Sequence, residues 1–129
     1  MATIYKEIDL PVSPEALWEK VAGVGEVHKF MPVITDCRIE DDRRFCTMAD
    51  GAKLEEIVLG VDKAKRRVAY TITKSPFPFD FHSASMQVVP NGKNARLIWI
   101  TDLKPDALAE QMESVLNQVA QSLQQKFSR

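Results

Sequence analysis

The stretch that decides the fold is DALAEQMESVLNQVAQSLQQKF, residues 106–127. It contains neither Gly nor Pro, the two residues that most often interrupt a helix. Its apolar residues recur every three or four positions, which places them in one stripe: Leu108, Met112, Val115, Leu116, Val119, Leu123 and Phe127. The pattern predicts one long helix that buries this stripe against another layer of the protein.

Ahead of this helix the pattern repeats every two residues, which is typical of strands. The alternation predicts strands over residues 3–10, 34–39, 44–49, 53–61, 67–74, 80–89 and 95–103. The strands after the first are joined by turns or short loops, among them Asp50-Gly51 and Asn91-Gly92, so they form an antiparallel series. We expect this sheet to bend and to cover the helix stripe with its concave face.

Two short helices are expected between the first and second strands. Ser13 is suited to cap a helix, and Pro14 fits the first helical position, where its missing N–H group costs nothing. Gly23 ends this helix, and a second helix is predicted over about residues 25–31, ended by Pro32. The order of elements predicts an α+β fold, with a curved antiparallel sheet around a long C-terminal helix.

The composition is that of one domain, residues 1–129, with enough apolar residues for a core. Apolar residues make up 45% of the chain, and a net charge of -1 gives no indication of nucleic-acid binding. No apolar run approaches the roughly 20 residues of a membrane span, and early charges argue against a signal peptide, so we expect a cytoplasmic protein. Cys37 and Cys46 are expected as free buried thiols, and no metal or cofactor pattern is visible.

A set of residues spread over nearly the whole chain is similar to a known family: Pro11-x-x-Pro14-x-x-x-Trp18, Phe30-Met31-Pro32, Glu56 six residues before Asp62, Arg66-Arg67-Val68-x-Tyr70, Val89-Pro90-Asn91-Gly92 and Trp99. They resemble the polyketide cyclase/dehydrase-like branch of the START-like superfamily, also called SRPBCC, which includes the birch pollen allergens. The resemblance implies the helix-grip fold, in which a curved seven-stranded antiparallel sheet grips the C-terminal helix and two short helices close one end. Members of this superfamily bind lipids, sterols, plant hormones, quinones or polyketides, and some are enzymes.

Every second residue of a strand lies on the same face of the sheet. The resemblance to the family decides which face points to a cavity between the sheet and the helix, and this gives the residues expected to face that cavity. On the strand over 53–61 these are Leu54, Glu56, Val58 and Gly60, although the opposite face of this strand is equally apolar. Glu56 stands out, because a carboxylate on an apolar face is costly unless a ligand, a water molecule or a base meets it. The alternatives for Glu56 are a solvated strand residue or a structural pair with an arginine.

The other residues expected to bind a ligand are Tyr70, His82, Met86, Trp99, Met112 and Leu116. Tyr70 and Trp99 offer a flat apolar body with one polar tip, which suits a ligand ring or the core. His82 is either an acid–base companion of Glu56 or a hydrogen-bonded wall residue. Met86 and Met112 either line a deformable ligand pocket or belong to the hydrophobic core. No residue is assigned a catalytic role.

Three functions are open at this point. The favoured one is a non-catalytic protein that binds a small hydrophobic molecule, of the lipid, quinone, polyketide or aromatic class, in an apolar cavity. The second is a polyketide cyclase or dehydratase, which needs a positioned base and a group that stabilises an enolate oxygen. The third is an interaction protein with little cavity. One acid and one histidine are few polar groups for a reaction, so binding is favoured, while the ligand and the oligomeric state are left open.

Overall fold

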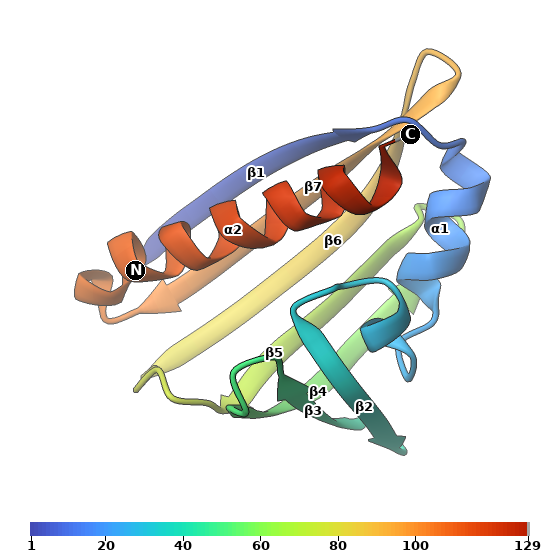
Figure 1. The fold of residues 1–129 in the computed structure, drawn as a ribbon. Coiled ribbons are helices and arrows are strands. Elements are labelled where there is room, and N and C mark those ends of the chain that lie inside the picture. The colour runs from blue at the N-terminus through green and yellow to red at the C-terminus, as the bar shows by residue number, and fades with distance from the viewer. Residues whose placement is uncertain (129) are drawn as a thin grey trace.

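The computed structural model describes residues 1–128 and combines one sheet with one long helix (Figure 1). Its strands are β1 (Ala2–Leu10), β2 (Ile34–Glu40), β3 (Arg43–Met48), β4 (Lys53–Asp62), β5 (Arg67–Lys74), β6 (Phe81–Asn91) and β7 (Asn94–Lys104). Its helices are α1 (Pro14–Ala22) and α2 (Ala109–Phe127), with the 3-10 turns η1 (Val27–Lys29) and η2 (Asp106–Leu108). Each predicted strand is present, with ends within two residues of the predicted ones.

The strands form one seven-stranded antiparallel sheet in the order β1-β7-β6-β5-β4-β3-β2. Strands β2 to β7 lie beside their neighbours in sequence, as the short connections predict, and β1 pairs with β7. Figure 1 shows the sheet curving under α2, which lies over its β1 and β7 side, while α1 closes one end. The predicted α+β class and the antiparallel sheet around the C-terminal helix are confirmed.

The turn between β3 and β4 fixes the register of these two strands. Gly51 has a φ of 90°, a left-handed value that a β-carbon disfavours. The Asp50 side chain stabilises the same turn, because its Oδ1 accepts the Ala52 N–H over 2.9 Å. As a consequence of this register, Arg44 on β3 lies directly opposite Glu56 on β4.

A bulge in β4 changes one predicted face. The register against β5 shifts between Val58 and Gly60, so Leu59 is left outside the ladder. Val58 pairs with Tyr70, whereas Gly60 pairs with Ala69, which lies on the opposite face. The prediction that Gly60 faces the cavity is therefore wrong, because counting by two does not anticipate an extra residue.

The short helices agree with the sequence at the first and differ at the second. Ser13 Oγ accepts the Ala16 N–H over 3.1 Å and caps α1, as predicted. The second expected helix, over about 25–31, is reduced to the single turn η1. Its first residues are held against β2 instead, since a β-carbon on Gly25 would lie 2.8 Å from the Ile39 Cγ2 atom. A glycine allows this close approach, because it has no β-carbon.

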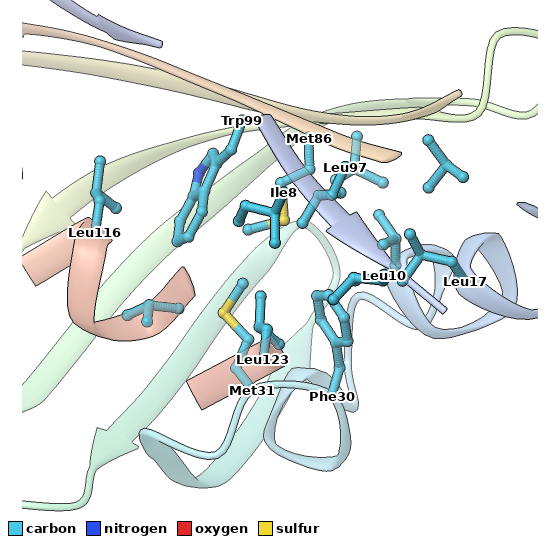
Figure 2. Packing of buried hydrophobic residues seen from close by; sticks show 14 of the residues in the cluster. Ile8, Leu10, Leu17, Phe30, Met31, Met86, Leu97, Trp99, Leu116 and Leu123 are labelled. Atoms are coloured by element: carbon cyan, nitrogen blue, oxygen red, sulfur yellow. The ribbon is translucent and has the colours of Figure 1, made fainter. Parts of the chain in front are cut away.

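The apolar stripe of α2 is buried against the concave face of the sheet, as predicted. Met112, Leu116, Val119 and Leu123 are the buried residues of this helix. Figure 2 shows Leu116 and Leu123 pointing from α2 into the cluster that contains Trp99 and Met31. The helix begins three residues later than predicted, because residues 106–108 form η2. Each fully buried leucine of this kind contributes about 1.5–3 kcal/mol to folding.

Replacing Leu123 by alanine tests the dependence of the fold on this stripe. Leu123 is 0% exposed, so Leu123→Ala leaves a cavity in the core and should lower the free energy of unfolding by about 2–5 kcal/mol. The matched control is Gln124→Ala, one residue along on the exposed side of α2, which should change it by less than about 0.5 kcal/mol. Urea denaturation followed by circular dichroism measures both, and equal small effects would contradict the described packing.

Candidate functional site

A cavity of about 100 Å³ lies between the concave face of the sheet and α2. Six of the residues predicted to face a ligand line it: Glu56, Tyr70, Met86, Trp99, Met112 and Leu116. Within residues 1–128, His82 is not part of its wall. The cavity alone is smaller than ordinary ligand pockets, which measure about 300–1,000 Å³. Its volume suits one ring or a few methylene groups.

A wider groove of about 410 Å³ adjoins the cavity, between the turn after β3, the loop after β5 and α2. The two spaces share part of their wall: Val33, Met48, Leu54, Val115 and Val119. Phe77, on the loop after β5, lines the groove and stacks on Phe79, with ring centroids 5.7 Å apart. The groove therefore lies directly beside the cavity.

An ion pair is built into the wall of the cavity. Arg44 Nε–H donates to Glu56 Oε1 over 2.8 Å, and the two side chains are 6% and 7% exposed. Arg44 Nη1 also donates to the Val24 carbonyl oxygen over 3.1 Å, and the guanidinium carbon lies 5.2 Å from the centre of the Tyr70 ring. Of the alternatives open for Glu56, the structure therefore shows a pair with an arginine, and a contact with a ligand stays a prediction.

Arg44 is the residue of this site that the sequence reasoning missed. The alternation over residues 44–49 does not single it out, because both faces of that strand mix polar and apolar residues. A signal was nevertheless present in the Asp50-Gly51 turn. A three-residue hairpin loop over residues 49–51, with Gly51 in the left-handed conformation, places residue 44 opposite residue 56, and the structure has this register.

Burial and pairing act in opposite directions on the ionisation of the site. Burial raises the pKa of the Glu56 carboxyl, and the Arg44 guanidinium opposes this rise. For Arg44 itself burial lowers the pKa, but the attraction of Glu56 outweighs it, so the guanidinium stays charged. Burial also raises the pKa of the Tyr70 hydroxyl, which keeps it a neutral phenol. With both side chains ionised, the pair carries no net charge.

The site keeps hydrogen-bonding capacity beyond the ion pair. Within residues 1–128, no hydrogen bond engages Glu56 Oε2 or Arg44 Nη2. Tyr70 Oη accepts the Trp99 Nε1–H over 3.0 Å, which leaves the tyrosine O–H as a donor. Acceptors and donors thus lie together in a wall that is otherwise apolar. Such a wall is suited to a group that both donates and accepts, such as a hydroxyl.

His82 belongs to the sheet more than to the cavity. Its Nδ1 accepts the Ile72 backbone N–H over 3.0 Å, where β5 and β6 stop pairing beyond Tyr70. The ring lies near Tyr70 and Phe79, with centroid distances of 5.9 and 5.2 Å. Burial lowers the pKa of His82 to about 4, so the ring is neutral at pH 7, as an accepting nitrogen requires. Of the two alternatives for His82, the structure shows the hydrogen bond but not the place in the cavity wall, and no hydrogen bond joins His82 to Glu56 in the described chain.

Other kinds of site are not formed by the part of the chain that the structure describes. Residues 1–128 hold no cluster of three or more His, Cys, Asp or Glu side chains placed to bind a metal ion. None of their helices is long and apolar enough to cross a membrane. Cys37 and Cys46 are free thiols, the first partly exposed and the second buried. The described lining of the cavity offers apolar contact, with hydrogen-bonding groups at one wall.

The neutral state of His82 should make stability depend on pH. The pKa of His82 is about 4 in the folded protein and about 6.5 in the unfolded chain. The stabilisation that depends on neutral His82 is therefore complete above pH 6.5 and is lost as the pH falls towards 4. Over this pH range the free energy of unfolding of the wild type should fall by up to about 3 kcal/mol more than that of the His82→Asn variant. Asparagine is chosen because its side-chain oxygen can still accept the Ile72 N–H. Urea denaturation at a series of pH values measures the difference. His28→Asn, which removes the other histidine, is the control, and parallel curves for wild type and His82→Asn would contradict the assignment.

The buried pair should show strong coupling in a double-mutant cycle. Glu56→Leu leaves Arg44 buried and without its partner, and should cost about 3–5 kcal/mol of unfolding free energy, while Arg44→Met/Glu56→Leu should recover most of the loss. Arg38 and Glu40, joined over 2.7 Å but 56% and 62% exposed, give a matched control pair with coupling below about 1 kcal/mol. Equal coupling in the two pairs would show that the cavity pair is as solvated as the surface pair.

Comparison with known proteins places this geometry in a family. Residues 1–128 match the family described as polyketide cyclase/dehydrase and lipid transport. The chain is 20% identical to the protein XoxI of Bacillus cereus, with a TM-score of 0.88 over 98% of this chain and 96% of that one. It is 15% identical to a START superfamily protein from Mycobacterium smegmatis, with a TM-score of 0.72 over 97% and 96% of the two chains.

A larger protein contains the same fold as part of its chain. The di-domain ARO/CYC BexL of the BE-7585A biosynthetic pathway is 14% identical, with a TM-score of 0.84 over 97% of this chain and 46% of that one. At these identities the structural likeness establishes the helix-grip fold alone. A search of curated protein sequences gives no match. The match to the family over residues 1–128 shows that the chain belongs to the polyketide cyclase/dehydrase and lipid-transport family.

Proposed function

We propose that this protein binds a small, largely apolar molecule with one neutral polar end, without transforming it. The family and the fold indicate a hydrophobic ligand-binding or polyketide cyclase-like role. The observation that carries the narrower proposal is the Arg44–Glu56 pair, which presents free hydrogen-bonding atoms in the wall of an apolar cavity. A polar end that meets this pair fixes the orientation of the ligand.

The sizes of the two spaces support a ligand that occupies both. The cavity of about 100 Å³ accepts a ring or a short chain end, and the groove of about 410 Å³ accepts the rest of the molecule. Leu54 lies at their shared wall. An apolar body along this path loses water on entry, which is the main source of affinity for such ligands.

The polar end is expected to be a hydroxyl, an enol or a protonated carboxylic acid. Such a group donates to Glu56 Oε2 and accepts from Arg44 Nη2 or from the Tyr70 hydroxyl, and it brings no net charge into the cavity. A free carboxylate is less suitable, because it would repel the Glu56 carboxylate at close range. An alkane or an unsubstituted ring leaves these polar atoms without partners, and therefore binds less well.

Binding is favoured over catalysis by the state of the polar groups. A cyclase or dehydratase needs a free base and a group that stabilises an enolate oxygen. Glu56 is the carboxylate that lines the cavity within residues 1–128, and it is held by Arg44. His82, the other candidate base, accepts a backbone N–H instead. The description of the family names both cyclase/dehydrase activity and lipid transport, so membership alone does not decide between the two roles.

The proposal predicts where and how a simple probe binds. 1-Naphthol should bind at least about tenfold more tightly than naphthalene, since one satisfied buried hydrogen-bonding site is worth about 1.5 kcal/mol. The Arg44→Met/Glu56→Leu variant should bind both probes about equally. Leu54→Trp should block the path between groove and cavity and abolish naphthol binding. Fluorescence titration measures each affinity.

The matched control is Leu59→Trp, which puts the same bulk on the same strand at a position 56% exposed and outside both spaces. It should bind naphthol as the wild type does. Equal binding by Leu54→Trp and Leu59→Trp would place the ligand elsewhere. Binding of neither probe, together with an unchanged melting temperature in a panel of fatty acids, quinones and aromatic polyketides, would favour an interaction protein.

A further inference from the structure

Two cysteines face each other across the first hairpin of the sheet. Cys37 on β2 is the direct partner of Cys46 on β3 in the antiparallel register. Their sulfur atoms are 3.6 Å apart, and both are free thiols. The sequence places no other cysteine in the chain, so each thiol has one neighbour of its kind.

The backbone at this position is suited to a cross-link. Opposite residues of an antiparallel pair have Cα atoms about 4.5–5.5 Å apart, inside the range of about 4.4–6.8 Å that disulfides span. The sulfur atoms need to approach by only about 1.5 Å to form a bond, a distance that rotation of the side chains covers. No movement of β2 relative to β3 is required.

The two thiols differ in their access to solvent. Cys37 is partly exposed and lies on β2, which is an edge strand of the sheet. Cys46 is 2% exposed and packs in the core, opposite Leu54 of β4. Burial, and then the nearby Glu56, raises the pKa of the Cys46 thiol, so it is the less reactive of the two. A dissolved oxidant therefore meets Cys37 first.

We propose that Cys37 and Cys46 form a site of reversible oxidation by hydroperoxides, with Cys37 as the attacking thiol and Cys46 as the resolving thiol. In the first step the Cys37 sulfur attacks one peroxide oxygen, the O–O bond breaks, and Cys37 sulfenic acid forms with release of water or an alcohol. In the second step the Cys46 sulfur attacks the Cys37 sulfur, the S–OH bond breaks, and a second molecule of water leaves. Two thiols are oxidised to one disulfide while one hydroperoxide is reduced.

The disulfide acts on the wall of the ligand cavity. β2 and β3 contribute Ile34, Arg44 and Met48 to that wall, and Arg44 lies two residues before Cys46 on the same face of β3. A covalent link between the strands restrains the edge strand and this wall together. The oxidised protein should therefore unfold at a melting temperature about 5 °C higher than the reduced protein.

Peptide mapping by mass spectrometry tests the site on the full chain. The reduced protein is treated with hydrogen peroxide, alkylated and digested. The expected result is a monomer that has lost two hydrogen atoms, with the peptides of Cys37 and Cys46 linked, and that dithiothreitol returns to its original mass. Cys46→Ala should accumulate a sulfenic acid on Cys37 that dimedone traps, while Cys37→Ser should leave Cys46 unmodified.

Three results would overturn the proposal. They are a Cys37 that stays reduced under peroxide, a Cys37 that passes to sulfinic acid in the wild type without linking to Cys46, and a disulfide between two protein molecules. Each is read from the wild-type protein itself, so the test does not depend on the folding of a variant. The linked peptide from a monomer that has lost two hydrogen atoms, in contrast, can form only if the two thiols of one chain meet.

Discussion

The burial of one helix stripe against a bent sheet is the constraint on which the structure depends. α2 has apolar residues on one side, and the concave face of seven strands is the surface that covers them. The pairing of β1 with β7 completes that surface by bringing the N-terminal strand beside the last strand. A straight helix cannot follow a curved sheet along its whole length, so a cavity of about 100 Å³ remains between their side chains. Stability and ligand space therefore come from the same contact.

The polar chemistry of the cavity follows from one turn. Gly51 sets the register of β3 and β4, and this register puts Arg44 opposite Glu56 inside the curve of the sheet. Neither side chain is favourable there alone, and the 2.8 Å contact makes both tolerable. An ion pair of this kind adds little to stability compared with apolar residues of equal volume. Under the proposed function, this pair offers hydrogen bonds to a molecule in the cavity.

The sequence predicted those features that repeat and missed those that depend on a single local event. The period of α2 and the alternation of the strands identified the layers, and with them the inward side of Tyr70 and Trp99. The bulge at Leu59 moved Gly60 to the other face, since an extra residue leaves no trace in the alternation. Arg44 was missed because each strand was examined alone. Its role depends on Glu56, which lies opposite it on the neighbouring strand. His82 was placed on the correct strand, but its bond to a backbone N–H depends on where β5 and β6 separate, which no pattern reports.

The most direct test of the account is an NMR titration that watches the side-chain N–H groups of the cavity wall. With 1-naphthol, the Nε–H signal of Arg44 and the indole N–H signal of Trp99 should shift together and saturate at one concentration, because one ligand touches the wall that both residues line. The backbone signals of Tyr5 and Leu59, which are exposed residues outside the cavity, should stay unchanged. Shifts confined to such exposed positions, with Arg44 and Trp99 unaffected at saturation, would contradict the claim that the cavity between the sheet and α2 is the binding site.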